Sequence, residues 1–331
     1  MPNGKRSVAK VCRRGFRHTG VFVVRIMAGS TRYTGDLNLV SAYKTADYRA
    51  VLERGDILFF PDGGFRIPED VRTALTGTAQ NSRSFHKNIS YKPNVDRVSG
   101  LSSRNERESV GAAMRAYSRS ALDFLRRILP EYSHAWSVDY ASFRSIEERG
   151  RELPLNKRND LLHVDAFPTR PVFGNLILRC FTNVNPQQSR EWVTSDPFAI
   201  LAPREAESAN LSRYARRAGS WWRQRVARKA LRGIHRIGLP VTDRSPYDAF
   251  MLHFHDWLKA NRGYQESSPK YRFSLPPGST WLVFTDVVPH AVMEGQYALE
   301  QTVIVSRESL LSPGSAPVSI LERIAGRSLV P

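Results

Sequence analysis

The sequence predicts a mixed α+β fold in which short strands form the core and helices flank it. Short apolar runs with strand-like alternation dominate the part of the chain from residue 136 to residue 305. Two longer segments, 106–129 and 247–260, instead repeat their apolar residues at helical spacing. The chain has 331 residues and is 41% hydrophobic, which is enough for one large domain. Many short strands with outer helices are typical of a double-stranded β-helix, the jelly-roll barrel of the cupin type.

The first half of the chain contributes more predicted helix than strand. Residues 48–55 predict a short helix that ends at a glycine. Residues 57–61 predict a buried strand stopped by proline, and Pro68 opens a helix with acidic residues in its first turn. Residues 106–129 predict an amphipathic helix, which Pro130 ends, and we expect it to pack on the back of a sheet.

The second half supplies most of the barrel. Residues 136–144 alternate like a strand, and residues 176–186 form an apolar strand that ends at a proline. Residues 247–260 predict a helix, and residues 281–284 and 301–305 predict the last strands.

The chain divides into three expected regions. Residues 1–45 are basic and predict a flexible N-terminal segment, residues 46–310 a single domain, and residues 311–331 a C-terminal tail. The domain carries an insertion at about 205–240, in which arginines interleave with apolar residues at helical steps over 211–237. This basic amphipathic helix is either packed on the domain with a solvated face or in contact with anionic lipid headgroups.

A formal net charge of +18 indicates an anionic partner, but composition does not choose among nucleic acid, a membrane surface and an anionic substrate. No nucleic-acid motif is present, and aromatics are not interleaved with bases as in a stacking platform. Two cysteines suggest a reducing compartment. No apolar run approaches the ~20 residues that span a bilayer. We therefore expect a cytoplasmic protein.

The chemistry is predicted by His163, Asp165 and the distant His290. Two histidines and one carboxylate form the facial triad that holds Fe(II) and leaves positions open for a bidentate 2-oxo acid and O2. Residues i and i+2 of a strand share a face, so His163 and Asp165 can both face the barrel interior. His253 and His255 lie at i and i+2 of a helix and point apart, so we expect them to be structural.

The distal carboxylate of 2-oxoglutarate needs a cation inside the barrel. Related oxygenases often place an arginine on the strand after the second histidine, where this chain has residues 299–302 and no arginine. Arg179 is the better candidate, because a buried arginine in a strand requires an anionic partner. Arg307 is the reserve candidate. Asn183 and Asn185 are either donors to the cosubstrate or turn residues at the strand end.

Six segments, in the same order, resemble the bacterial hydroxylases of 3-deoxy-D-manno-oct-2-ulosonic acid (Kdo). They are residues 56–61, 87–91, 162–171, 177–186, 245–252 and 289–297. The resemblance runs from about residue 52 to about residue 305, although residues 152–160 lack the Ser-Trp-Arg run of the family and residues 187–192 match it only in part.

The resemblance implies an Fe(II)/2-oxoglutarate/O2-dependent dioxygenase that hydroxylates carbon 3 of Kdo on Kdo-lipid A and so gives Ko in the lipopolysaccharide inner core. It also implies a Gram-negative source and work at the cytoplasmic face of the inner membrane, in peripheral contact with it. An anionic glycolipid fits the net charge of +18. Three basic residues are candidates for holding the sugar carboxylate or a phosphate: Arg170, Lys87 and Arg190.

Three other functions remain open at this point. The first is an oxygenase of the same class acting on a protein or a small metabolite. The second is a non-catalytic basic protein that binds membrane or RNA through residues 211–237. The third is a zinc-binding, sugar-handling cupin, which would not depend on Fe(II) and 2-oxoglutarate.

Overall fold

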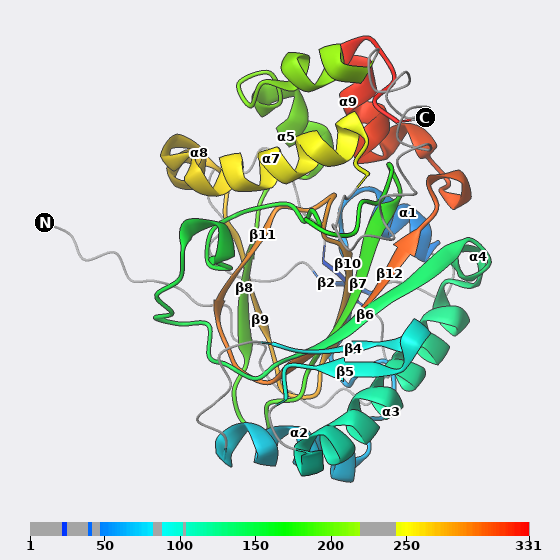
Figure 1. Ribbon diagram of the computed structural model, residues 1–331, viewed down its shortest axis with the longest axis vertical. Helices are drawn as coiled ribbons and strands as arrows, with labels where there is room; N and C mark the ends of the chain where they lie inside the picture. The colour runs from blue at the N-terminus through cyan, green and yellow to red at the C-terminus, as the bar shows by residue number, and fades with distance from the viewer. Residues whose placement is uncertain are drawn as a thin grey trace, which may run out of the picture.

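Two antiparallel sheets face each other and enclose the core (Figure 1). The computed structural model describes residues 22–24, 39–41, 47–81, 88–101, 104–218 and 243–330. The strands are β1 (Phe22–Val24), β2 (Leu39–Ser41), β3 (Ile57–Phe60), β4 (Ile89–Lys92), β5 (Arg97–Ser99), β6 (Trp136–Arg144), β7 (Leu176–Asn183), β8 (Arg190–Thr194), β9 (Tyr271–Leu275), β10 (Thr280–Phe284), β11 (His290–Glu294) and β12 (Ala298–Val305). The helices are α1 (Tyr48–Glu53), α2 (Glu69–Asn81), α3 (Arg104–Ile128), α4 (Pro130–Ser133), α5 (Phe198–Glu205), α7 (Pro246–Ala260), α8 (Arg262–Ser267) and α9 (Pro317–Ala325).

The strand order is that of a double-stranded β-helix. The large sheet runs β2-β1-β3-β10-β7-β12-β6-β4-β5, and the small sheet runs β11-β8-β9. An isolated antiparallel bridge between His163 and His290 adds the segment around His163 to the outer side of β11. The predicted α+β fold with a jelly-roll core is confirmed.

An aromatic group fills the space between the two sheets. Phe181 of β7 stacks on Trp281 of β10, with ring centroids 5.3 Å apart. Trp192 of the small sheet meets Phe181 edge-on at 4.9 Å. All three side chains are buried. Large aromatic rings bury much apolar area and favour such offset and edge-on arrangements, so they fix the spacing of the sheets.

Helices α2 and α3 cover the outer face of the large sheet, as Figure 1 shows for α3 along β4, β5 and β6. Two side chains of α3 reach this sheet. Tyr117 donates its hydroxyl to the carbonyl oxygen of Cys180 at 3.2 Å, and Ser118 donates to Oε1 of Gln301 at 2.7 Å. The packing helix predicted over 106–129 is therefore confirmed.

Helix α7 lies across one end of the barrel (Figure 1). A capping box fixes its first turn: the Ser245 hydroxyl accepts from the amide of Asp248, whose carboxylate accepts from the amide of Ser245. The same carboxylate accepts from the amides of Val172 and Phe173, at 2.8 and 3.1 Å. Because Asp248 serves both segments, α7 is tied to the loop that follows Asp165.

Both expected ends of the domain need correction. In the N-terminal segment, Leu39–Ser41 is the edge strand of the large sheet and Phe22–Val24 lies between it and β3. In the sequence, basic residues surround the first of these short apolar runs. The rest of residues 1–45 lies outside the described residues. The expected tail instead contains α9, whose buried residues include Val318 and Leu321. The buried carboxylate of Glu53 also accepts from two backbone amides at residues 311 and 312.

The basic insertion is described only as far as residue 218. In residues 211–218, which are helical, Leu211 and Ala215 are buried while Arg213 and Arg216 are exposed. These two turns therefore have the solvated basic face of a packed helix, and residues 219–242 lie outside the described part. None of the described helices has the length and apolar character to cross a membrane.

Candidate active site

The small sheet brings the predicted ligands together. The amides of His163 and His290 each donate to the other's carbonyl oxygen, at 3.2 and 2.9 Å, and their ring centroids lie 4.7 Å apart. Oδ1 of Asp165 lies 4.0 Å from Nε2 of His163. The amide of Asp165 donates to the carbonyl oxygen of Thr285 at 2.9 Å, which ties the motif to the end of β10.

Each imidazole has its Nδ1 engaged by a backbone carbonyl, and Nε2 of His163 faces Asp165. Nδ1 of His163 lies 2.7 Å from the carbonyl oxygen of Leu161, and Nδ1 of His290 lies 3.0 Å from that of Val288. A carbonyl accepts only from N–H, so the proton is on Nδ1 and the lone pair is on Nε2. Burial lowers the pKa of both histidines, so the rings are neutral, as metal ligands must be.

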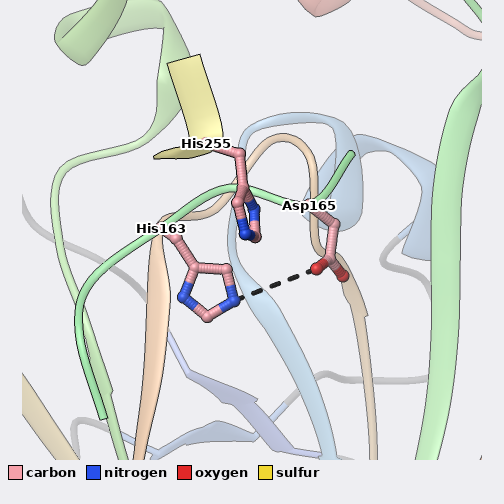
Figure 2. A group of neighbouring side chains, drawn as sticks. All are labelled: His163, Asp165 and His255. Carbon is pink, nitrogen blue, oxygen red and sulfur yellow. Dashed lines mark ion pairs between the residues drawn. The ribbon is translucent and has the colours of Figure 1, made fainter. Parts of the chain in front are cut away.

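A third histidine, which we expected to be structural, lies beside the site. His255 of α7 offers a ring nitrogen, and its ligand atom and those of His163 and Asp165 lie within 4.8 Å of one another (Figure 2). Its Nδ1 lies 2.7 Å from the carbonyl oxygen of Val164, inside the motif itself. His253 points elsewhere and stacks on Tyr214 at 5.5 Å, so the two histidines do not chelate jointly.

Arg179 is the hub of a buried charge network. Its Nη2 lies 2.9 Å from Oδ2 of Asp165, and its Nη1 donates to Oε1 of Glu300 at 2.5 Å. Glu300 also accepts from Arg144, at 2.7 Å. Burial raises the pKa of Asp165, but the Arg179 guanidinium outweighs it and holds that pKa below its ordinary value. The buried Arg179 thus has two carboxylate partners within the protein, Asp165 and Glu300.

Two buried arginines keep N–H groups without a hydrogen-bond partner. These groups are Nε of Arg179, and Nε and Nη2 of Arg190. Arg190 donates Nη1 to the carbonyl oxygen of Gly295 at 2.9 Å, and its Nη2 lies 3.5 Å from Oε1 of Glu148. Burial lowers the pKa of Arg190 to about 10. Unpaired guanidinium donors inside a barrel suit a carboxylate of a cosubstrate.

The remaining candidates lie apart from this network or outside the described residues. The Asn183 side chain donates to two backbone carbonyls and accepts from the backbone amide of Asn185. The side-chain oxygen of Asn185 accepts from two further backbone amides. The turn alternative is therefore favoured for both residues. Arg307 follows β12 in a short 3-10 turn. Arg170 lies over the rings of Tyr140 and Phe167, at 3.9 and 4.2 Å. Lys87 lies outside the described residues. Arg179, Arg190 and these five stay predictions as cosubstrate or substrate residues.

The residues present fit a divalent iron ion. His163 and His290 offer neutral nitrogens and Asp165 an ionised oxygen, which is the donor set of a facial triad. Oδ2 of Asp165 is buried and lies 2.9 Å from Nη2 of Arg179, but the geometry of this ion pair is not that of a hydrogen bond. A metal ion would satisfy such an oxygen.

Sequence comparison places the chain in a family. A model of the 3-deoxy-D-manno-oct-2-ulosonic acid (Kdo) hydroxylases matches residues 37–328. The chain belongs to the Kdo hydroxylase family. No curated protein sequence matches it significantly.

Solved structures of a Kdo hydroxylase are similar to most of this chain. The crystal structure of KdoO, a non-haem Fe(II) α-ketoglutarate-dependent dioxygenase, with α-ketoglutarate and Fe(III), is 31% identical with a TM-score of 0.69 and covers 84% of this chain and 89% of its own. The apo structure has a TM-score of 0.70 at the same identity and coverage. The complex with cobalt(II) has a TM-score of 0.69, again at that identity and coverage.

The predictions of enzyme class and cofactors are confirmed for this hydroxylase: it is a non-haem Fe(II)- and 2-oxoglutarate-dependent dioxygenase of the Kdo hydroxylase family. The third histidine could have been found in the sequence only by knowing that α7 crosses the barrel end. Glu300 could have been found from its own strand, because an acidic residue at an inward position of a buried strand requires a cation.

Proposed function

We propose that the protein hydroxylates carbon 3 of the Kdo sugar of Kdo-lipid A and so produces Ko. The observation that carries this proposal is the position of the two histidines and Asp165 at one end of a barrel whose interior holds unpaired guanidinium donors. Such an arrangement serves a metal and a dicarboxylate together, in a chain of the Kdo hydroxylase family. The net charge of +18 supports an anionic glycolipid as substrate.

Each part of the site has a role in this reaction. His163, Asp165 and His290 would hold Fe(II) through Nε2, a carboxylate oxygen and Nε2, on one side of the ion. Bound iron with 2-oxoglutarate and O2 supplies the oxidant that replaces a C–H hydrogen by hydroxyl, and 2-oxoglutarate leaves as succinate and CO2. Arg179 keeps Asp165 ionised, and Arg179 or Arg190 binds the distal carboxylate of 2-oxoglutarate.

The surroundings position the reacting groups and exclude water. Helix α7 covers the barrel end, and His255 holds the carbonyl oxygen of Val164, which lies between the two ligands of the motif. The aromatic group of Phe181, Trp192 and Trp281 closes the space behind the site. Holding the C–H bond in one orientation is the main contribution a protein makes to chemistry carried by its cofactor.

The test is a single-turnover product analysis. Purified, anaerobically iron-loaded protein is mixed with 2-oxoglutarate, O2 and Kdo-lipid A, and mass spectrometry is used to look for one added oxygen atom on the sugar. We expect this product only when both Fe(II) and 2-oxoglutarate are present, and we expect none from H163A. Succinate formed without the oxygenated sugar would keep the dioxygenase and overturn the proposed substrate.

We also propose that the protein works at the cytoplasmic face of the inner membrane, in peripheral contact with it. The exposed arginines at 213 and 216, on a helix whose other face is buried, support this position because polybasic surfaces are attracted to anionic lipid.

A further inference from the structure

Helix α7 presents two side chains, one turn apart, to the metal-binding segment. His255 meets the ring of His163 with centroids 4.8 Å apart and holds the carbonyl oxygen of Val164. Lys259 follows four residues later and therefore lies on the same face of the helix. It is only 4% exposed, which is unusual for a lysine.

The ammonium group of Lys259 has a neutral partner. Its Nζ donates to the carbonyl oxygen of Asn156 at 3.1 Å. No ion pair within 4.0 Å joins it to a carboxylate of the described residues, although Asp165, Asp256 and Asp160 act on it from farther away. Burial lowers its pKa to about 8.

The buried arginines around the metal site differ from Lys259 in this respect. Arg179 pairs with two carboxylates, Arg144 pairs with Glu300, and Arg190 lies beside Glu148. Each of these arginines therefore has at least one carboxylate of the protein beside it, although Arg179 and Arg190 keep N–H groups without a hydrogen-bond partner. An ammonium carries three N–H groups, and a buried charge without a counter-ion is costly. Lys259 is therefore the cation beside the metal segment, among the described residues, that most needs an external anion.

An open hollow lies beside this region. Its volume is about 630 Å³, and its lining includes Leu153, Pro154, Arg158 and Asp160, which flank Asn156 in the chain, and Met293 of β11. Met293 lies three residues after His290 on the same strand. The hollow is therefore bordered by the segment that Lys259 contacts and by the strand that carries His290.

We propose that Lys259 binds the carboxylate of the Kdo sugar and so holds carbon 3 beside the metal. In a 3-deoxy-2-ulosonic acid the carboxylate carbon is two bonds from carbon 3, so the cation that recognises it must lie close to the metal. This inference rests on the proposed function, because it names the group by which the proposed substrate is held.

The test separates the sugar carboxylate from that of 2-oxoglutarate. The full-length protein is loaded with Co(II), which does not turn over, and the visible absorption of the bound metal is followed as 2-oxoglutarate and then Kdo-lipid A are added. Variants K259M and K259Q are compared with wild type, and K270M is the control. Lys270 is exposed and also donates to backbone carbonyls, so K270M removes the same charge from an exposed position.

We expect K259M and K259Q to bind Kdo-lipid A about 10- to 100-fold more weakly than wild type, as the loss of a charged hydrogen bond requires. We expect their affinity for 2-oxoglutarate, their Co(II) spectrum and the behaviour of K270M to be unchanged. A Kdo-lipid A whose sugar carboxylate is methylated should bind wild type as weakly as it binds K259M, because the group that Lys259 recognises is gone. The comparison of methylated and unmethylated Kdo-lipid A on wild type alone tests the assignment without any variant.

Two results would overturn the assignment. One is an unchanged affinity of K259M for Kdo-lipid A, and the other is a loss of 2-oxoglutarate affinity in its place. If wild type hydroxylates Kdo-lipid A while K259M binds it normally, only the role of Lys259 fails. If wild type neither binds nor hydroxylates Kdo-lipid A, the proposed function fails and this assignment fails with it.

Discussion

At the scale of single residues, two opposed effects set the pKa of Asp165 and so its charge at the site. Burial raises its pKa, while the Arg179 guanidinium lowers it and prevails. The carboxylate is therefore ionised before any metal binds, and the two histidines are neutral. A metal ion then needs to displace no proton from these three ligands near neutral pH.

The first prediction concerns Arg179. Without its guanidinium, burial dominates and the pKa of Asp165 rises, so protons compete with the metal as the pH falls. We expect R179M to bind Co(II) more weakly than wild type, with a deficit that grows from about pH 8 to about pH 6. Metal titration at several pH values measures this. R179K, which keeps a charge, should show a smaller dependence, and a profile identical to wild type in R179M would contradict the role given to this residue.

The second prediction concerns Asp286, whose pKa burial raises to about 7. Its Oδ1 accepts from the amide of Ile177, and its buried Oδ2 has no partner. The unfolded chain releases this proton near its ordinary pKa of 3.8, so between about 4 and about 7 the folded state binds more protons and stability falls as pH rises. D286N has no titratable group at this position, so its free energy of unfolding should lack this decrease.

Urea unfolding of the metal-free protein tests this expectation. The free energy of unfolding of D286N, relative to wild type, should rise from about pH 4 to about pH 8 by at most about 4 kcal/mol. A difference that stays constant over this range would show that Asp286 is already ionised in the folded protein.

Sequence patterns identified the metal triad because its residue types and spacing carry the chemistry directly. His163 lies beside both other predicted ligands: its Nε2 is 4.0 Å from Oδ1 of Asp165, and its ring centroid is 4.7 Å from that of His290. The assignment of the three residues as iron ligands stays a prediction. His255 was missed because helical periodicity shows that two side chains point apart but not which of them faces the site. The charge partners of Arg179 come from distant strands, so no local pattern could have named them.

At the scale of elements, α7 connects the fold to the chemistry. Its first turn is fixed by the capping box at Ser245 and Asp248, and its later turns carry His255 and Lys259 to the metal segment. Because the Asp248 carboxylate also holds the amides of Val172 and Phe173, one residue sets the position of the helix relative to the loop after the motif.

The third prediction therefore concerns D248A. It removes the N3 side chain of the capping box and leaves the amides of Val172 and Phe173 without their acceptor, so we expect a loss of about 2 to 4 kcal/mol in the free energy of unfolding. Denaturant unfolding measures it. D123A removes an exposed carboxylate of α3 that pairs with Arg126, and it should change stability by less than ~0.5 kcal/mol. Equal losses in the two variants would argue against the double role of Asp248.

Elements with strong periodicity and clear end signals were predictable. Helices α3 and α7 and strands β3, β6, β7 and β10 lie where the apolar pattern, proline or glycine places them. β1 and β2 were missed because a three-residue strand has no measurable period. Helix α9 was missed because its apolar face is short and follows a turn rich in serine and proline, which is typical of a chain end.

At the scale of the whole molecule, exposed arginines lie on distant parts of the described structure. Residues 211–218, which carry the exposed Arg213 and Arg216, pack beside α7 through Tyr214 on Phe250. Helix α3 runs along the part of the molecule opposite to α7 (Figure 1). The interior arginines are matched by carboxylates and contribute little to the outside field.

The fourth prediction concerns the proposed membrane contact. The protein should co-sediment with vesicles containing anionic lipid and not with zwitterionic ones, and added salt should release it because exposed charges are screened. R213E/R216E should bind these vesicles more weakly than R126E/R127E, which reverses two exposed charges on α3. Equal weakening would assign the attraction to net charge alone and contradict a directed contact.

The bridge between His163 and His290 has a consequence for folding. The two histidines come from distant parts of the chain and become neighbours only when the small sheet gains its outermost segment. Contacts between remote residues form late, because the intervening chain must be closed first. A metal ion that needs both imidazoles therefore binds the completed barrel and not its precursors. When the free metal concentration exceeds the dissociation constant, the added stability grows with the logarithm of their ratio. The free energy of unfolding of this protein should therefore rise with the free metal concentration, because binding and folding are linked.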